Sequence, residues 1–591
     1  MKIIELKEKI INRLGEAIRK TTGEKPENIE LSFPPDSKLG DFTFECFFLA
    51  KKLGKSPAEI SLAIASNFDS DEILEKVSAT GPYLNIKITN LALFSVLEEI
   101  LSQKNDFGNS KDKKEKVMIE YLGPNTNKPL HLGHARNGSL GTALANILEK
   151  TGCEVLKANI INDRGIHICK SMLAYQKWGE DSTPESLKMK GDYFVGHWYV
   201  RYNQELQNNP ELENEIQEML RKWENGDKEI LKLWKKMNEW VYAGWETTLE
   251  ELNFKFDIID YESKNYKSGK DIIAKGLEKG VFEKNESGAV IFNLPEKEFG
   301  LDKDGNAKKI TLARADGTSV YITQDIGTAV FRAEKYNLDR LIYVVGLEQV
   351  YHFQCLLKIL KSLGYKWAKN LFHLSYGMIT LPEGKMKSRE GKVVDADDLI
   401  KEIKELASKE VRKRISAQGG LASGWEKISD EEINERARKI ALGAIKFYFL
   451  RVGANQNIEF NPQESVSFDG FTGPYCQYAY ARIASILRKR GDEKNIDFKI
   501  LGNNLEEREL IKKIIEFPDL IKKSASEYNP SIIAVNTFET AQLFNKFYQK
   551  RKVLSAETEE LKNARLALIQ AVQILLKVGL NLLGIETLEK M

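Results

Sequence analysis

Two of the six histidines in the sequence stand three positions apart, shortly after a lysine and a proline, in the segment KPLHLGH (128–134). A spacing of three places both imidazoles on one face of a helical turn. At a helix start, the dipole and the free backbone N–H groups favour phosphate, Gly133 lets a nucleotide approach the backbone closely, and Lys128 adds positive charge. The pattern therefore predicts a triphosphate site built on His131 and His134.

A metal site explains the same residues less well. Two histidine ligands would need a third ligand, and the same turn offers none. The five cysteines are scattered and never form a Cys-x-x-Cys pair, so neither a disulfide framework nor a structural zinc site is expected. We expect no metal of the protein's own, and we expect buried thiols at Cys46, Cys153, Cys169, Cys355 and Cys476.

A basic segment lies further along the chain, between two glycines. Four of the eight residues from 385 to 392 are Lys or Arg. Its glycines predict a flexible loop, which could close over pyrophosphate while negative charge shifts between phosphates. A solvated basic turn explains the segment equally well when it is taken alone. Together with the histidine pair, it predicts the second half of a nucleotide site.

The elements around the histidine pair predict a parallel sheet. VMIEYL (117–122) and EVLKANII (154–161) predict buried strands, and the stretch between them predicts a helix with an apolar face. Such a strand-loop-helix-strand unit is the usual start of a doubly wound sheet. Trp-, Lys- and Glu-rich residues at about 170–255 predict a helical insertion. The same sheet is expected to resume in four further strands, at AVIFNL (289–294), KKITLAR (308–314), SVYIT (319–323) and RLIYVVG (340–346).

The remaining sequence predicts two more domains. Residues 1–110 combine a helical start with the strand GPYLNIKI (81–88), and a charged linker follows them. From residue 399 onward the periodicity is almost entirely helical. The predicted fold class is therefore α/β, with a doubly wound Rossmann-type catalytic domain at 111–398, an α/β domain at 1–110 and an all-helical domain at 399–591.

The composition is that of a folded soluble protein, with 42% hydrophobic and 29% charged residues. The most apolar stretch, 566–585, carries a polar residue every three or four positions and so predicts an amphipathic helix instead of a bilayer span. We expect a cytoplasmic monomer that does not bind membranes. The 88 basic residues nearly balance the 86 acidic ones, so any RNA binding must rest on local patches.

The segment GPNTNKPLHLGHARNGSLG (123–141) resembles the signature of class I aminoacyl-tRNA synthetases, whose hallmarks are a His-x-Gly-His element and a Lys-Met-Ser-Lys-Ser loop. Its Pro-Asn and Lys-Pro pairs, together with VVGLEQVYHFQ (344–354), are similar to arginyl-tRNA synthetases. The resemblance implies that the chain uses ATP, with Mg²⁺ on the phosphates, to activate arginine and to load it onto tRNA(Arg). It also implies catalytic roles for Lys128, His131 and His134.

Two alignments of the basic loop remain open. Aligning on Lys385-Met386 puts Lys387 where serine is usual, whereas aligning on Lys387-Ser388 makes Lys387 the second lysine of the motif. The resemblance therefore implies a catalytic lysine at Lys385 or Lys387. It implies ATP contacts from Gly133, His131, His134, Met386, Lys387, Ser388 and Arg389.

A pocket for arginine needs carboxylates and a hydroxyl around a planar, permanently charged guanidinium. Candidates beside predicted sheet ends are Glu120, Tyr321 and Asp325, while amides at Asn125 and Gln349 could hold the amino and carboxylate groups. Taken singly, the helix dipole explains Asp325, and packing on a half-buried strand explains Tyr321. The resemblance strengthens the set, because arginyl-tRNA synthetases carry these residue types in the same order.

Aromatic and basic residues cluster twice near the C-terminus, at 471–490 and 544–552. Aromatic rings can stack unpaired bases while Arg and Lys meet phosphates, although an ordinary helical bundle explains any single residue. GPYCQYAYARI (473–483) resembles the start of the family's anticodon-binding domain, and residues 39–60 resemble part of its N-terminal extension, which touches the tRNA body. The implied tRNA contacts are Tyr475, Gln477, Tyr478, Arg482, Phe547 and Tyr548.

Two rival functions follow from the same residues. A ligase of the same fold could act on another amino acid or a small carboxylate, and substrate profiling would separate it from an arginine enzyme. A non-catalytic tRNA-binding relative would not turn over ATP. The intact histidine pair and basic loop argue against the second rival.

Overall fold

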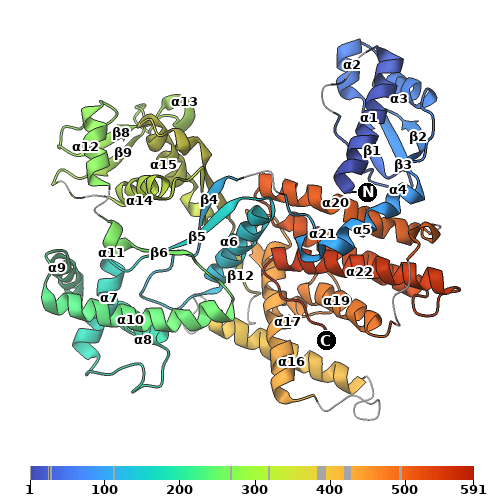
Figure 1. The fold of residues 1–591 in the computed structure, drawn as a ribbon. Helices are drawn as coiled ribbons and strands as arrows, with labels where there is room; N and C mark the ends of the chain where they lie inside the picture. Colours follow the sequence, from blue (N-terminus) through green and yellow to red (C-terminus); the bar gives the residue numbers. More distant parts are fainter. Residues whose placement is uncertain are drawn as a thin grey trace. The chain divides into compact units, whose positions relative to one another are not determined.

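A computed structural model of the chain is shown in Figure 1. It describes the 591 residues apart from 1, 24, 25, 27, 28, 37, 111–113, 267, 268, 317, 319, 383–393, 418–427, 491–495 and 503. The chain forms two compact units. The first comprises residues 1–109, 467–527 and 532–591, and the second comprises residues 110–466 and 528–531.

A five-stranded sheet lies at the centre of the second unit, in the order β11-β10-β4-β5-β6. Its strands are β4 (Lys116–Glu120), β5 (Glu154–Ile161), β6 (Ile258–Tyr261), β10 (Arg340–Gly346) and β11 (Leu371–Tyr376). All four pairings are parallel. Of these five strands, β4 comes first in the chain and lies in the middle of the sheet, and the chain reverses its direction of winding between β4 and β10. The predicted doubly wound sheet is confirmed, and this reversal point is where such sheets bind ligands.

The residues of β4 explain its central place. Val117, Met118 and Ile119 are fully buried, as expected of a parallel strand that is covered on both faces. The helix after it, α6 (Leu132–Lys150), packs against β4, β5 and β10. The histidine pair therefore lies at the start of a helix that leaves the carboxyl end of the middle strand.

Two predicted strands form a separate sheet, and a third is not a strand. β7 (Glu283–Lys284), β8 (Val290–Asn293) and β9 (Lys309–Ala313) pair antiparallel, outside the parallel sheet. The strand predicted at 319–323 is wrong, because Tyr321 begins helix α14 (Tyr321–Tyr336). Buried Ile322, Ile326 and Ala329 recur at helical spacing, and five alternating residues were too few to separate the two periodicities.

The second unit also contains helices and a short strand pair around the sheet. The stretch predicted as a helical insertion holds α7 (Ile166–Trp178), α8 (Gly191–Leu206), α9 (Leu212–Glu224) and α10 (Lys228–Glu251), which group together in Figure 1. The other elements are α11 (Glu262–Asn265), α12 (Lys270–Glu278), α13 (Glu296–Phe299), η2 (Leu347–Gln349), α15 (Val350–Ser362), η3 (Lys366–Asn370), β12 (Ile379–Thr380), α16 (Ala396–Ala417), α17 (Asp430–Leu450), β13 (Ile458–Glu459) and α18 (Pro462–Ser465).

The first unit combines the two ends of the chain. Its N-terminal part is an antiparallel sheet in the order β1-β3-β2 with helices beside it, and its C-terminal part is helical. The elements are α1 (Ile3–Thr22), β1 (Phe42–Glu45), α2 (Phe47–Leu53), α3 (Pro57–Ser66), β2 (Leu74–Thr80), β3 (Tyr83–Ile88), α4 (Asn90–Ser95), α5 (Leu97–Gln103), η1 (Lys104–Asp106), α19 (Gly473–Leu487), η5 (Phe498–Ile500), α20 (Leu505–Ser526), α21 (Ser531–Lys550) and α22 (Glu559–Leu582).

A buried ion pair joins the two parts of this first unit. The carboxylate of Asp41 accepts hydrogen bonds from the Arg508 guanidinium at 2.6 Å and from the backbone N–H of Ile88 at 2.8 Å. The domain limits predicted from the sequence stay a prediction. The limit at residue 399 falls inside α16, which packs on α17 in the second unit.

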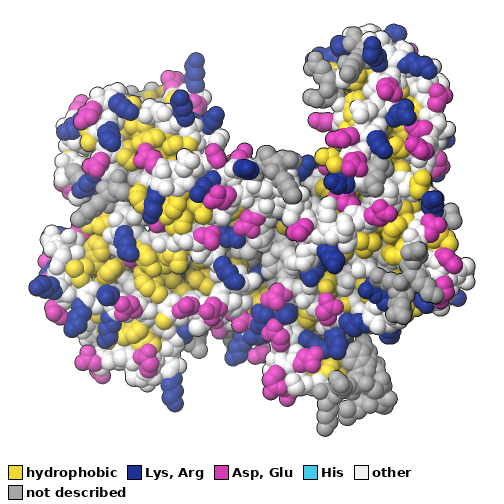
Figure 2. Space-filling view, in the orientation of Figure 1, with side chains coloured by type: hydrophobic (Ala, Val, Ile, Leu, Met, Phe, Trp, Pro, Cys, Tyr) yellow, Lys and Arg dark blue, Asp and Glu magenta, His cyan; other side chains and the backbone are white. Residues whose placement is uncertain are grey.

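The surface and the most apolar helix match the composition. Basic and acidic side chains are interspersed over the face shown in Figure 2. Within the described residues, α22 is the one helix long and apolar enough to cross a membrane, and 72% of its most apolar window is buried inside the protein. Its residues Gln570, Gln573, Lys577 and Asn581 are less buried than their apolar neighbours, as expected for a core helix with one polar face.

Candidate active site

The histidine pair caps the first turn of α6 through both of its rings. The Nδ1 atom of His131 accepts the Gly133 backbone N–H at 3.1 Å, and the Nδ1 atom of His134 accepts the His131 backbone N–H at 3.1 Å. The two rings contact each other with centroids 3.8 Å apart. This reciprocal cap has the geometry of a capping box, with imidazoles in place of the usual hydroxyl and carboxylate.

Burial keeps both rings neutral, and the cap fixes which nitrogen of each ring carries the proton. Burial, reinforced by the charge of Lys128, lowers the pKa of His131 to about 4, and burial with the neighbouring His131 lowers the pKa of His134 well below 6.5. Both rings are therefore neutral at pH 7. Because each Nδ1 accepts a backbone N–H, each Nε2 carries the ring proton. The turn thus presents two uncharged N–H donors of defined tautomer.

The backbone N–H groups of the first turn are not free, which corrects the sequence prediction. The Leu132 N–H donates to the Val394 carbonyl at 2.9 Å, and the His134 N–H donates to the His131 carbonyl at 2.8 Å. Gly133 has a further role, because a Cβ atom there would lie 3.0 Å from the His131 ring. The donors that remain at this turn are therefore the imidazole N–H groups.

The chain segment after the predicted basic loop is paired with the histidine turn. Asp395 and His131 form an antiparallel bridge, and the Ala396 N–H donates to the Leu130 carbonyl at 2.8 Å. The predicted loop residues Lys385, Met386, Lys387, Ser388 and Arg389 lie outside the described residues. Their place in the site stays a prediction, whereas residues 394–396, further along the chain, are hydrogen-bonded beside the turn from His131 to His134.

The loop between β4 and α6 has an uncommon backbone. Leu122 has a φ angle of 82°, which residues other than glycine rarely adopt, and the φ angle of Gly123 is 60°. Asn137 of α6 stabilises this conformation, since its Oδ1 accepts the Leu122 N–H at 2.6 Å and its Nδ2 donates to the Val344 carbonyl at 2.8 Å. One side chain thus joins the loop, α6 and β10 at the reversal point of the sheet.

A second polar residue of α6, Arg136, binds backbone segments from elsewhere in the second unit. The buried guanidinium of Arg136 donates to four backbone carbonyls, of Gly377, Met378, Ala454 and Gln456, at 2.6 to 3.1 Å. Burial lowers its pKa to about 10, so that it remains charged at pH 7. Arg136 holds the segments that lead into β12 and β13 against the start of α6.

The predicted arginine-binding residues Tyr321 and Asp325 lie one turn apart on α14. The Asp325 carboxylate is bonded to His352 Nε2 of α15 at 2.6 Å, and the rings of Tyr321 and His352 lie 5.4 Å apart. Burial raises the pKa of Asp325, while the contact with His352 opposes that shift. Tyr321 is 61% exposed, and the Asp325 carboxylate raises the pKa of its hydroxyl. The group offers one carboxylate and one protonated hydroxyl.

Glu120 is already paired with an arginine of the protein itself. Arg332 of α14 is fully buried and bonds to Glu120, and it pairs with Asp260 of β6 at 2.7 Å. Although burial opposes its charge, Glu120 and Asp260 raise the pKa of Arg332 above its ordinary value. A direct contact between Glu120 and a substrate guanidinium would have to share the carboxylate with Arg332. This tertiary pairing was not expected from the sequence.

The two predicted amides lie at the ends of neighbouring strands. Asn125 follows β4 and pairs through its backbone with Asn162, which follows β5, and the Asn162 N–H donates to the Pro124 carbonyl at 2.9 Å. Gln349 ends the short helix η2 after β10 and is half-buried. Both positions border the reversal point of the sheet.

The predicted tRNA contacts divide into a partly exposed group and a buried group. The Arg482 guanidinium lies over the rings of Tyr478, at 4.8 Å, and Tyr548, at 5.8 Å. The Tyr475 hydroxyl accepts a hydrogen bond from Asn545 at 2.9 Å. Gln477 and Phe547 are fully buried, so in this conformation neither side chain can touch RNA. Packing inside the bundle explains these two.

A described groove lies elsewhere in the second unit. A groove of about 790 Å³ runs along α16, and its lining includes none of the predicted ATP- or arginine-binding residues. Among the described residues, no three His, Cys, Asp or Glu side chains gather in a way that could hold a metal ion. The expectation of no structural zinc stays a prediction.

Known protein families and relatives match this chain over nearly its whole length. The model of the class I (R) tRNA synthetase catalytic domain matches residues 96–461, the arginyl-tRNA synthetase N-terminal domain matches 6–88, and the DALR anticodon-binding domain matches 476–591. The arginine–tRNA ligase of Treponema denticola is 44% identical, over 96% of this chain and 95% of its own. That of Borrelia hermsii is 42% identical over 99% of both chains.

The chain belongs to the arginyl-tRNA synthetase family.

The solved structure of Thermus thermophilus arginyl-tRNA synthetase has the same fold, with a TM-score of 0.83 and 27% identity over 99% of this chain and all of that one. As a member of this family, the chain is an enzyme that activates arginine with ATP and charges tRNA. The comparisons do not support a same-fold ligase for another amino acid or a non-catalytic relative.

Several residues that shape the arginyl-tRNA synthetase site were missed by sequence reasoning. His352, Arg332 and Asn137 each act through a partner on another element. A usable signal for Asn137 was its position beside Arg136 in a helix whose other buried residues are mostly apolar or small. His352 lies inside the quoted segment VVGLEQVYHFQ, but its pairing with Asp325 depends on how α14 and α15 pack.

His131 and His134 are both expected to stay neutral in mildly acidic solution. Between pH 6.5 and about 4 the unfolded chain takes up protons at these positions while the folded chain does not. The pair therefore makes the free energy of unfolding fall as the pH is lowered through this window. NMR titration of the ring Cε1–H resonances should show no midpoint between pH 8 and 5.5, whereas the urea-unfolded protein should titrate near pH 6.5. A midpoint near 6.5 in the folded protein contradicts the burial argument.

Proposed function

We propose that the turn from His131 to His134 holds the phosphates of ATP, and that its two neutral imidazoles stabilise the charge that develops in the transition state. The observation that carries the proposal is the occupation of both Nδ1 atoms by backbone N–H groups. It leaves two Nε2–H donors that need no reorganisation when charge builds on the phosphate oxygens. Lys128, beside the turn, supplies a positive charge.

The reaction proceeds in two displacements. A carboxylate oxygen of arginine attacks the α-phosphorus of ATP, and the bond to the bridging oxygen breaks as pyrophosphate leaves with the electron pair. A terminal ribose hydroxyl of the tRNA then attacks the arginyl carbonyl carbon, and AMP leaves. Mg²⁺ that arrives with ATP would neutralise part of the phosphate charge. Lys385 or Lys387 of the basic loop, with Met386, Ser388 and Arg389, completes the proposed phosphate contacts.

Arginine binds at the carboxyl ends of β4 and β10 in this proposal. Asp325 pairs with the guanidinium, and the Tyr321 hydroxyl lies on the same face of α14 one turn earlier. Asn125 and Gln349 hold the amino and carboxylate groups of the amino acid. Glu120 contributes negative charge to the pocket while it remains bonded to Arg332.

The tRNA contacts both ends of the chain. Residues 1–110 meet the tRNA body, and the helical residues within 399–591 bind the anticodon. Tyr475, Tyr478, Arg482 and Tyr548 are the proposed contacts, because a guanidinium between two partly exposed rings suits a stacked base beside a phosphate. The enzyme acts as a cytoplasmic monomer without binding membranes.

A charging assay with each of the twenty amino acids tests this function. Purified tRNA, ATP and Mg²⁺ are supplied throughout, and aminoacylated tRNA is measured by the retention of labelled amino acid. We expect ATP-dependent charging with arginine alone. Charging with lysine or glutamate would refute the proposed pocket. Tight tRNA binding without any ATP turnover would refute the proposed phosphate site.

A further inference from the structure

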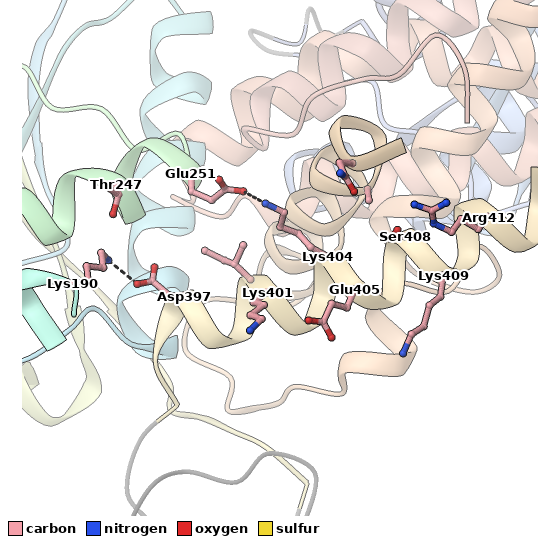
Figure 3. A pocket seen from close by; sticks show the side chains of 13 residues that line it. Lys190, Thr247, Glu251, Asp397, Lys401, Lys404, Glu405, Ser408, Lys409 and Arg412 are labelled. Carbon is pink, nitrogen blue, oxygen red and sulfur yellow. Dashed lines mark hydrogen bonds and ion pairs between the residues drawn. The ribbon is translucent and has the colours of Figure 1, made fainter. Parts of the chain in front are cut away.

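A lysine at the start of α8 joins the helices of the insertion to the start of α16. The Lys190 Nζ lies 2.6 Å from Asp397, 2.5 Å from the Thr248 hydroxyl of α10 and 3.3 Å from Asp192. The Thr248 hydroxyl donates in turn to Asp397 at 2.8 Å. We name these four residues the polar clasp. Figure 3 shows Lys190 reaching from its element to Asp397.

The clasp is built into the packing of α8 and α10. Asp192 is fully buried and Thr248 is 2% exposed, so both polar groups depend on partners within the protein. A Cβ atom on Gly244 would lie 2.5 Å from the Asp192 carboxylate, which explains the glycine at that position of α10. Lys190 is the cation that two carboxylates share, and its removal would leave Asp192 and Asp397 close together without this counter-charge.

The start of α16 bears directly on the histidine turn. Asp397 is two residues beyond Asp395, which bridges His131, and one beyond Ala396, whose N–H donates to the Leu130 carbonyl. The Val394 carbonyl accepts the Leu132 N–H at 2.9 Å, the first N–H of α6. A shift of Asp397 would therefore move the backbone against which the histidine turn is hydrogen-bonded.

The same two helices hold the other side of that turn. The Trp245 indole of α10 donates to the Lys128 carbonyl at 3.2 Å. Gly196 of α8 lies against Pro129, since a Cβ atom there would be 3.1 Å from the proline ring. The helical insertion thus contacts both segments that flank His131, one through Trp245 and Gly196 and the other through the polar clasp.

We propose that the polar clasp positions the histidine turn for ATP, and that Lys190, Thr248 and Asp397 are positioning residues for the activation step. The proposal rests on the proposed function of His131 and His134. It assigns to the insertion a role in ATP use that is separate from any contact with tRNA. None of the four clasp residues is placed in contact with a substrate.

The rest of the groove in Figure 3 gives no reason to assign it a ligand instead. Lys401 and Lys409 alternate with Glu405 along α16, and Lys404 pairs with Glu251 at 3.2 Å. Charges of both signs at helical spacing are typical of a solvated helix face. Of the clasp residues, Lys190 and Asp397 line this groove, and their ion pair is backed by the buried side chains of Asp192 and Thr248.

The test uses near-isosteric changes of neighbouring threonines in the full-length enzyme. Thr248→Val removes the clasp hydroxyl, and Thr248→Ser retains it. Thr247→Val is the control, because it removes an exposed hydroxyl that donates to the Gly244 carbonyl of its own helix. Arginine-dependent ATP–pyrophosphate exchange is measured with tRNA present throughout, along with tRNA binding and the melting temperature. Lys190→Met and Lys190→Arg form a second pair.

We expect Thr248→Val and Lys190→Met to lower kcat/KM for ATP by about 10-fold or more, because loss of a residue that orients the groups in contact with a ligand typically has an effect of this size. KM for arginine and the Kd for tRNA should stay unchanged. Thr248→Ser should keep most of the kcat/KM for ATP, and Thr247→Val should behave as the unaltered enzyme. The ring resonances of His131 and His134 should shift in Thr248→Val but not in Thr247→Val.

Three results overturn the clasp proposal. The first is a Thr248→Val enzyme that is folded and has unchanged kcat/KM for ATP. The second is an equal loss in Thr248→Ser, and the third is a loss that affects arginine, ATP and tRNA equally, because either result indicates a purely structural role. Failure of the proposed function looks different, since the unaltered enzyme would then show no arginine-dependent exchange at all.

Discussion

Alanine at both His131 and His134 is expected to abolish arginine-dependent ATP–pyrophosphate exchange. Removing a single preorganised donor to a developing oxyanion typically costs about 100- to 1000-fold in rate, so loss of both should leave no measurable exchange. Both Nε2–H donors disappear in this variant, and so does the reciprocal cap of α6. The rate of exchange, measured at saturating arginine and ATP with tRNA present, checks the prediction. Exchange within 10-fold of the unaltered enzyme would remove the histidines from the mechanism.

A second variant separates the chemical role of the pair from its structural role. His131→Asn keeps a side-chain acceptor for the Gly133 N–H, and asparagine is among the best helix caps. We expect it to recover the melting temperature lost in the alanine variant and to remain at least 100-fold slow. His197→Ala, on the exposed side of α8, is the matched control and should leave exchange unchanged.

Asp325→Asn is expected to raise KM for arginine by about 100-fold and to leave KM for ATP unchanged. The change keeps the size of the side chain and its contact with His352 but removes the negative charge that we propose to pair with the guanidinium. Truncating one side of a buried charge pair typically costs about 2–5 kcal/mol, and about 3 kcal/mol corresponds to roughly 100-fold in affinity. Steady-state exchange kinetics with varied arginine measures the effect.

The control for this change lies on the same helix. Glu334→Gln removes a charge from the exposed side of α14 and should alter neither KM. A rise in KM for arginine below 3-fold in Asp325→Asn would show that the guanidinium binds elsewhere. Glu120→Gln provides a contrast, because its carboxylate is bonded to buried Arg332 and its loss is expected to lower the melting temperature as well.

Periodicity and spacing were enough to predict the frame of the site. The apolar run of β4, the turn with two histidines and the apolar face of α6 are each local in sequence, so they could be read without the fold. The segment at Tyr321 could not, because a short alternating run fits either a strand or a helix, and the buried positions that decide between them lie further along α14.

The remaining features depend on residues that meet only in the folded protein. The sequence offers Glu120 as a partner for arginine, but it does not reveal that Arg332, 212 residues away, already holds that carboxylate. Likewise, the first N–H of α6 looked free for phosphate until its acceptor, the Val394 carbonyl, was found beyond the basic loop. Gln477 and Phe547 have residue types suited to RNA, and only helix packing explains why they are buried.

The four carbonyls that surround Arg136 have a consequence for the order of events during synthesis. Two of them belong to Ala454 and Gln456, which follow Arg136 by 318 and 320 residues. Until the ribosome has released the chain beyond residue 456, this guanidinium has no complete set of acceptors inside the protein. The turn from His131 to His134 lies in the first quarter of the chain, yet a nascent fragment that ends before residue 454 lacks two of the four carbonyls that hold the helix beginning at this turn.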